Sequence, residues 1–198
     1  MADTDLYGNA PDKASAALLI VDVINDLEFP GADRLFESAK QMAERLADFK
    51  RRASSAGIPS VYVNDNFGRW RSNLESLVSY CLESKVRGQE IVKRLRPAGD
   101  DYFILKPKHS GFYSTPLQIL LEHLGASRLI ITGLTADSCV MFTANDAYVR
   151  GYELYIPEDC VASIEKDANE ESLQHMHRVL RANITSSTEL DLARLTQR

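Results

Sequence analysis

The sequence RLIITGLTADSCVMFTANDAYVR, residues 128–150, joins a short apolar run, a polar turn and a segment rich in small residues. Arg128–Thr132 has the continuous apolar character of a strand buried on both faces of a parallel sheet. Ser138–Arg150 is predicted to be a helix that packs closely against its neighbours through alanine side chains. The stretch therefore predicts a strand–turn–helix unit, with Cys139 in the first turn of its helix.

The same alternation of strand and helix continues in both directions along the chain. Further strands are predicted at residues 16–22, 58–64, 102–105, 152–156 and 182–185, and helical segments at 31–56, 74–81, 90–95, 114–124 and 167–181. Such alternation is typical of right-handed crossovers and a parallel sheet covered on both faces. Without a repeat, low-complexity tract or linker, the 198 residues fit a single domain over 1–198, with 1–13 loosely ordered. We therefore expect a three-layer α/β/α architecture.

Composition and charge limit the classes of partner. The net charge is −5 and no long basic run occurs, which is unlike a protein whose main partner is nucleic acid. No apolar run approaches the roughly 20 residues that cross a bilayer, and the polar, acidic N-terminus is unlike a signal peptide. The three cysteines lack CxxC spacing, which is typical of a reducing compartment. We expect a cytoplasmic protein with a small-molecule partner and neither a nucleic-acid nor a membrane partner.

Three reactive side chains are predicted at the carboxyl ends of strands, where ligands gather in open α/β sheets. Asp22 ends the first strand, Lys106 follows the third, and Cys139 lies beyond the fourth. An ammonium group and a helix N-terminus favour the thiolate form of a cysteine. A carboxylate accepts the thiol proton and later returns a proton to a leaving group. The grouping suits attack on an amide-like carbonyl, an oxyanion held by backbone N–H groups, and hydrolysis of a thioester.

Each of these residues also has an ordinary structural interpretation. A cysteine such as Cys139, taken alone, is more often a small buried hydrophobic residue. Asp22 is equally typical of a solvated strand end or a cap. Lys108 competes with Lys106, and spacing alone does not choose between them. Two further cysteines, Cys81 and Cys160, are interpreted as core residues.

Four segments of the chain resemble the isochorismatase-like cysteine hydrolases, which include nicotinamidases, N-carbamoylsarcosine amidases and isochorismatases. They are LLIVDVINDLEF (18–29), LKPKHSGFYSTPL (105–117), LIITGLTADSCVMFTANDAYVRGY (129–152) and PEDCVAS (157–163), and the ending ANITSSTEL (182–190) is also similar. The resemblance implies the isochorismatase-like (Rossmann-like) hydrolase fold with a six-stranded parallel sheet. It also implies an Asp-Lys-Cys triad and, as is common in that family, a homo-oligomer.

The resemblance assigns the family's aspartate to Asp22, its lysine to Lys106 and its cysteine to Cys139. Lys106 opens the Lys-Pro-Lys-His-Ser-Gly-Phe stretch and is therefore preferred to the lysine two residues later. The family also carries a non-proline cis peptide before the nucleophile, which would fall at Leu134–Thr135. It would aim the N–H groups of Thr135 and the cysteine at the oxyanion.

One departure from the family concerns a metal. Nicotinamidases resemble this chain but hold a divalent metal through an aspartate and two histidines in the stretch after the second strand. Asp65 remains in that stretch, whereas Phe67 stands where the first histidine would be, and no histidine occurs before residue 109. We therefore predict no catalytic metal and no other cofactor, and we do not expect nicotinamidase activity.

Several side chains near these segments are candidates to line a small substrate pocket. They are Asn66, Phe67, Trp70, Phe112 and Tyr113. For each aromatic ring, packing in the core is an equally common alternative.

The intact cysteine favours hydrolysis of a C–N bond, but two other functions stay open. One is an isochorismatase-type vinyl-ether hydrolase, whose chemistry does not depend on a cysteine nucleophile. The other is a catalytically idle family member that serves as a binding or assembly module.

Overall fold

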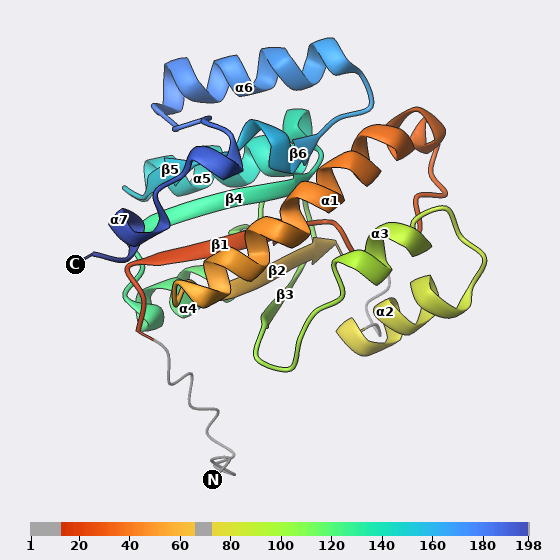
Figure 1. Cartoon of the computed structure of the whole chain (residues 1–198), viewed down its shortest axis with the longest axis horizontal. Helices are drawn as coiled ribbons and strands as arrows, with labels where there is room; N and C mark the ends of the chain where they lie inside the picture. The colour runs from red at the N-terminus through yellow and green to blue at the C-terminus, as the bar shows by residue number, and fades with distance from the viewer. Residues whose placement is uncertain (1–12, 66–72, 198) are drawn as a thin grey trace, which may run out of the picture.

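Six parallel strands form a sheet through the centre of the molecule (Figure 1). The computed structural model describes residues 13–65 and 73–197. The strands are β1 Ala16–Val21, β2 Ser60–Asp65, β3 Tyr102–Lys106, β4 Arg128–Leu134, β5 Glu153–Tyr155 and β6 Val161–Ala162. Their order is β3-β2-β1-β4-β5, with β6 paired to the end of β4. The predicted six-stranded parallel sheet is confirmed.

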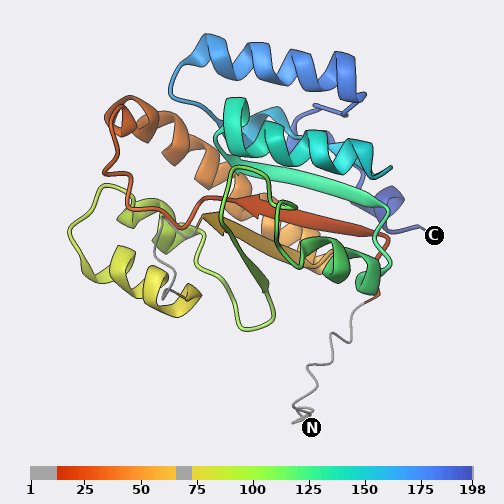
Figure 2. The ribbon, with the colours of Figure 1, turned by 180° about the vertical axis from the view of Figure 1, so that it is seen from behind.

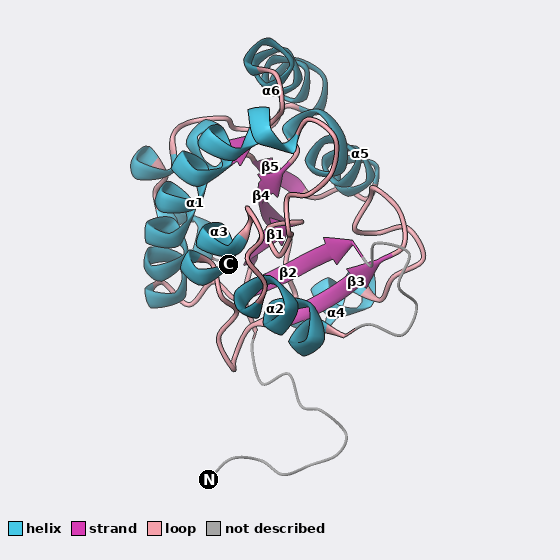
Figure 3. Cartoon of the chain, turned by 90° about the vertical axis from the view of Figure 1, so that its right-hand side faces the viewer, coloured by secondary structure: helices cyan, strands magenta, loops and turns pink. Residues whose placement is uncertain are grey.

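Helices cover both faces of this sheet, which confirms the three-layer α/β/α fold (Figures 2 and 3). They are α1 Ala32–Ser55, α2 Leu74–Glu83, α3 Gln89–Arg94, α4 Leu117–Leu124, α5 Met141–Val149, α6 Lys166–Leu180 and α7 Leu192–Thr196. Helices α1, α2, α3 and α7 share one hydrophobic core with the sheet, and α4, α5 and α6 share the other. None of the helices in the described ranges combines the length and apolar composition that crossing a bilayer requires.

The central strand β1 shows why the sheet is buried on both faces. Its sequence AALLIV is fully buried, so no position requires a polar side chain. Because side chains alternate along a strand, Leu18 and Ile20 enter one core while Leu19 and Val21 enter the other. A continuous apolar run, rather than an alternating one, is what such a strand needs.

The predicted strand at 182–185 is wrong. Only Asn183 forms a bridge, with Tyr155: its N–H donates to the carbonyl oxygen of Leu154 and its carbonyl oxygen accepts from the N–H of Ile156. The Asn183 side chain then accepts a hydrogen bond from the Thr185 N–H at 2.9 Å, which turns the chain away from the sheet. The sixth strand is instead Val161–Ala162, which is too short to give a periodic signal in the sequence.

Candidate active site

The candidate site lies beside the point where the sheet topology changes direction. Strands β1 and β4 are neighbours, while the chain proceeds outward from β1 to β2 and β3 on one side and from β4 to β5 on the other. Ligands of open α/β sheets bind at such a switch point, beyond the carboxyl ends of the strands. Asp22 directly follows β1, and Cys139 lies five residues beyond the end of β4. The fold therefore places both residues where this class of sheet carries its sites.

Close approach of β1 and β4 at this edge depends on a glycine. Gly133 pairs with Val21 and has a φ of 106°, a backbone conformation that residues with a side chain rarely adopt. A Cβ atom at Gly133 would lie 2.1 Å from the carbonyl oxygen of Val21. The peptide bond that follows, Leu134–Thr135, is cis.

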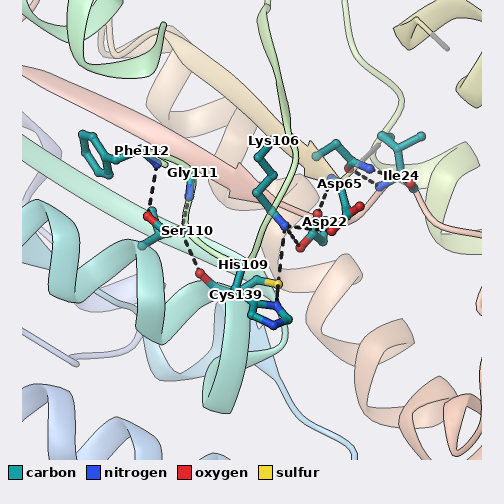
Figure 4. A network of polar contacts seen from close by, with 11 residues as sticks. Asp22, Ile24, Asp65, Lys106, His109, Ser110, Gly111, Phe112 and Cys139 are labelled. Atoms are coloured by element: carbon teal, nitrogen blue, oxygen red, sulfur yellow. Dashed lines mark hydrogen bonds and ion pairs between the residues drawn. The ribbon is translucent and has the colours of Figure 1, made fainter. Parts of the chain in front are cut away.

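Lys106 is the centre of a buried ionic cluster (Figure 4). Its Nζ lies 2.8 Å from Asp22 Oδ2, 3.5 Å from Asp65 Oδ2 and 3.4 Å from Cys139 Sγ. The lysine side chain has no exposed surface, whereas Lys108, its competitor in the sequence, is exposed. The three residues assigned by resemblance to a triad are therefore in contact, through Lys106.

Asp22 is held in place by backbone geometry and by the next strand. Its φ is 51°, in the left-handed region that costs a non-glycine residue about 1 kcal/mol or more. Its Oδ1 accepts a hydrogen bond from the Asp65 N–H at 2.6 Å. Buried Asn64 bonds both the N–H and the carbonyl of Ile24, at 3.1 and 2.9 Å, and so fixes the chain that leaves β1. Sequence reasoning missed this role of Asn64.

Cys139 lies in a π-helical turn, Ala136–Val140, that continues into α5. The predicted helix therefore begins with a turn of a wider type, which is common at functional sites. Ser163, the residue after β6, fixes the turn, because its Oγ donates to Asp137 Oδ1 at 2.9 Å and accepts from the Asp137 N–H at 3.2 Å. The carbonyl oxygen of Cys139 accepts a hydrogen bond from Thr143 Oγ1 at 2.7 Å.

A histidine that sequence reasoning did not assign to the site also contacts the sulfur. His109 Nδ1 lies 3.7 Å from Cys139 Sγ, and the His109 ring stacks on Phe142 with centroids 5.4 Å apart. The only sequence signal for His109 was its position three residues after Lys106.

Burial and the charge of Asp22 keep the resting thiol protonated. Burial and the negative charge of Asp22 raise the pKa of Cys139 to about 12, against the opposing effect of Lys106. Burial also raises the pKa of Asp22, although the Lys106 ammonium lowers it. For Lys106, burial lowers the pKa, but the charges of Asp22, Cys139 and Asp65 outweigh it and the net pKa is raised. The Lys106 ammonium acts in the expected direction and favours the thiolate, but burial and the charge of Asp22 outweigh it.

Of the residues expected to line a pocket, the structure describes Phe112 and Tyr113. Asn66, Phe67 and Trp70 lie outside the described residues. Phe112 is buried, packs against Tyr152 with ring centroids 6.0 Å apart, and points away from the sulfur (Figure 4). Tyr113 is 57% exposed. Phe112 therefore fills the core, as its alternative interpretation held.

The two other cysteines are buried. Cys81 and Cys160 are both in the core that contains α1. A cavity of about 610 Å³ lies between α1 and the segment from β6 into α6, but neither Cys139 nor its contacts line it.

No cluster of three metal-ligating side chains occurs within residues 13–65 and 73–197. Asp65, the remaining member of the nicotinamidase-like metal set, directs a carboxylate oxygen to Lys106. The prediction of no catalytic metal depends on Phe67, which lies outside those ranges. The absence of a catalytic metal therefore stays a prediction.

Comparison with known proteins identifies the family. The family model described as the isochorismatase domain matches residues 16–189. An uncharacterized isochorismatase family protein, YaaI, from Bacillus subtilis is 39% identical over 90% of this chain and 97% of its own length. Enterobactin synthase component B from Escherichia coli is 35% identical over 69% of this chain, which spans only 49% of that protein.

A solved structure agrees with this result. The crystal structure of N-carbamoylsarcosine amidase from Thermoplasma acidophilum is 27% identical, with a TM-score of 0.67, over 89% of this chain and 99% of that one. The family includes hydrolases of amide-like C–N bonds. This chain belongs to the isochorismatase family of hydrolases.

Proposed function

We propose that this protein is a cysteine hydrolase that cleaves an amide-like C–N bond of a small molecule through a thioester on Cys139, without a metal. One observation carries the proposal. Lys106 Nζ contacts a buried carboxylate oxygen of Asp22 at 2.8 Å and the sulfur of Cys139 at 3.4 Å. A base, a cation and a nucleophile are thus assembled at one point. Similarity to an amidase of carbamoyl-substituted sarcosine supports a substrate with an amide or ureide carbonyl.

The first half-reaction forms the thioester. The Asp22 carboxylate accepts the thiol proton as Cys139 Sγ attacks the carbonyl carbon, so that no free thiolate accumulates. The N–H groups of Thr135 and Cys139 are the proposed donors to the oxyanion. The Lys106 ammonium balances the negative charge that develops at the sulfur. As the C–N bond breaks, the Asp22 carboxylic acid returns its proton to the leaving nitrogen.

The second half-reaction consumes water. Attack of water on the thioester carbonyl and cleavage of the C–S bond release a carboxylic or carbamic acid and restore the thiol. The raised pKa of Asp22 suits acceptance of the thiol proton in the first half-reaction, because a carboxylate with a higher pKa is a stronger base.

Hydrolysis assays of the purified protein with a panel of small amides, ureides and nicotinamide test the proposal. Turnover of an amide or ureide is expected, with insensitivity to EDTA. Cys139→Ala should abolish turnover and any acyl adduct detected by intact-protein mass spectrometry. The matched control is Cys81→Ala, which removes a buried cysteine from the core and should leave the adduct in place.

Full turnover by Cys139→Ala would refute the proposal. Cleavage of a vinyl ether by Cys139→Ala, with loss of that activity in Asp22→Asn, would establish the alternative chemistry. If wild-type Cys139 reacted with thiol reagents no differently from Cys81 and no substrate turned over, a binding or assembly module would be the better interpretation.

A further inference from the structure

His109 occupies the solvent side of the candidate nucleophile. Its Nδ1 is 3.7 Å from Cys139 Sγ, whereas Lys106 Nζ is 3.4 Å from the same sulfur. Figure 4 shows the sulfur between the ammonium and the imidazole. Lys106 is fully buried and Asp22 is 6% exposed, but His109 is exposed. Lys106 and Asp22 therefore lie on the interior, charged side of the sulfur, and His109 lies on its solvent-exposed side.

The position of the imidazole is fixed by its neighbours. Its ring is stacked on Phe142, the second residue of α5, at an interplanar angle of 28°. The residues that follow it are tied to α5 as well. Ser110 Oγ donates to Asp146 Oδ2 at 2.5 Å, and the Gly111 N–H donates to Thr143 Oγ1 at 3.0 Å.

Thr143 connects this segment to the nucleophile. Its hydroxyl accepts from the Gly111 N–H and donates to the carbonyl oxygen of Cys139 at 2.7 Å. Thr143 is fully buried, so this relay is shielded from water. The segment that carries His109 and the turn that carries Cys139 are therefore fixed to the same helix.

We propose that His109 is the general base that activates water for hydrolysis of the thioester, an inference that rests on the proposed function. An acyl group on Cys139 places its carbonyl carbon next to Sγ. Water reaches that carbon from the exposed side, where the His109 imidazole is a basic group adjacent to the sulfur. Asp22 and Lys106 lie on the interior side, where the acyl group separates them from incoming water. A general base within hydrogen-bond reach of the attacking water is what this step needs.

The proton and electron balance of the step is complete. The water oxygen forms a bond to the carbonyl carbon while its proton passes to the imidazole. The C–S bond then breaks, and its electron pair leaves on sulfur as a thiolate. The imidazolium gives its proton to that sulfur from the adjacent Nδ1, which restores the neutral thiol and the neutral histidine. The net change is one thioester and one water converted to one acid and one thiol.

Burst kinetics with p-nitrophenyl acetate test the inference, because acylation releases p-nitrophenolate before water is needed. The variant is His109→Asn, whose amide occupies roughly the place of Nδ1 but does not accept a proton at neutral pH. We expect a burst of about one equivalent per chain at the wild-type rate, followed by a steady-state rate lowered about 100-fold. Values of kcat and KM should fall together, so that kcat/KM is unchanged. Mass spectrometry should show accumulated acetyl-enzyme.

Two controls separate the possible outcomes. His175→Asn changes a histidine on α6 whose nearest cavity contains none of the site residues, and it should behave as the wild type. Cys139→Ala should show no burst. If Cys139→Ala reacted like the wild type, or the wild type were not acylated, the proposed nucleophile would be refuted and the inference would fall with it.

The inference alone would be overturned if acylation still required Cys139 while His109→Asn kept the wild-type steady-state rate. A slower burst, or a higher KM with unchanged kcat, would overturn it equally. Those results would show that the imidazole acts on acylation or on substrate binding instead.

Discussion

Removal of the Lys106 ammonium should destabilise the fold, because the buried Asp22 carboxylate then loses the positive charge that it contacts. At 2.8 Å and an effective dielectric constant of about 20, the attraction between the two charges is about 6 kcal/mol. Desolvation of both groups offsets most of this attraction in the wild type. In Lys106→Met the desolvation of Asp22 persists without its partner, as the Asp22 side chain is only 8% exposed. We therefore expect a loss of about 3–5 kcal/mol in the free energy of unfolding at pH 7.

The loss should depend on pH in a defined direction. Burial already raises the pKa of Asp22 in the folded wild type, and removal of Lys106, which lowers it, raises it further. The folded variant then binds a proton more tightly than its unfolded chain does. Stability relative to wild type should recover as the pH falls, by up to about 1.4 kcal/mol per pH unit.

Urea unfolding followed by circular dichroism at pH 8, 7 and 6 measures both effects. Adding Asp22→Asn to Lys106→Met should restore part of the lost stability, because the double variant holds no unpaired carboxylate at residue 22. Lys40→Met, which removes a half-buried surface lysine paired with Glu90, is the control and should change little. Equal stability of Lys106→Met and wild type at all three pH values would refute the claim that Lys106 stabilises the buried, ionised carboxylate of Asp22.

Two further predictions concern the nucleophile turn and the thiol. Gly133→Ala should lower the free energy of unfolding by more than about 1 kcal/mol, because its Cβ would lie 2.1 Å from the Val21 carbonyl oxygen at a φ of 106°. Thermal unfolding checks this against Gly99→Ala, which enters open space, and a similar shift in both would contradict it. Because Asp22 helps to raise the pKa of Cys139 to about 12, iodoacetamide should label Cys139 faster in Asp22→Asn than in wild type at pH 8. Slower labelling in Asp22→Asn would mean that the carboxylate favours the thiolate.

The elements that sequence predicts well are those with a long apolar signal. The run at 16–22 reads as a buried strand because both faces of β1 are apolar, and α1 keeps helical spacing over many turns. β6 carries only two residues, and its pairing with β4 depends on contacts distant in sequence. The segment at 182–185 has an apolar start, but the Asn183 side chain turns it after one bridge. Short elements decided by tertiary contacts are thus the ones that local patterns miss.

The candidate site divides in the same way. Asp22 and Cys139 follow strands, so the parallel topology alone brings them to one edge. Asp65, the second carboxylate at Lys106, also lies at a strand end. It is the last residue of β2 and pairs directly with Lys106 in β3, so its position in the chain could have placed it in the site. For His109 the sequence offered only its position three residues after Lys106, since its contact with sulfur arises from how the segment after β3 folds onto α5. Site residues at or after strand ends can therefore be predicted from their position in the sequence, whereas the contact of His109 with the sulfur is known only from the three-dimensional structure.

The charge balance of the cluster explains why a protonated thiol suits this site. Two carboxylates face one ammonium, so a resting thiolate would add a second uncompensated negative charge in a buried place. The proton therefore stays on Cys139 until attack begins. A thiol with a high pKa is almost entirely protonated at neutral pH, so the attacking sulfur needs a base that takes its proton. Transfer of the proton to Asp22 during attack meets this need without a resting thiolate. The same high pKa draws a proton back to sulfur when the thioester is hydrolysed, and the adjacent imidazole of His109 is placed to supply it.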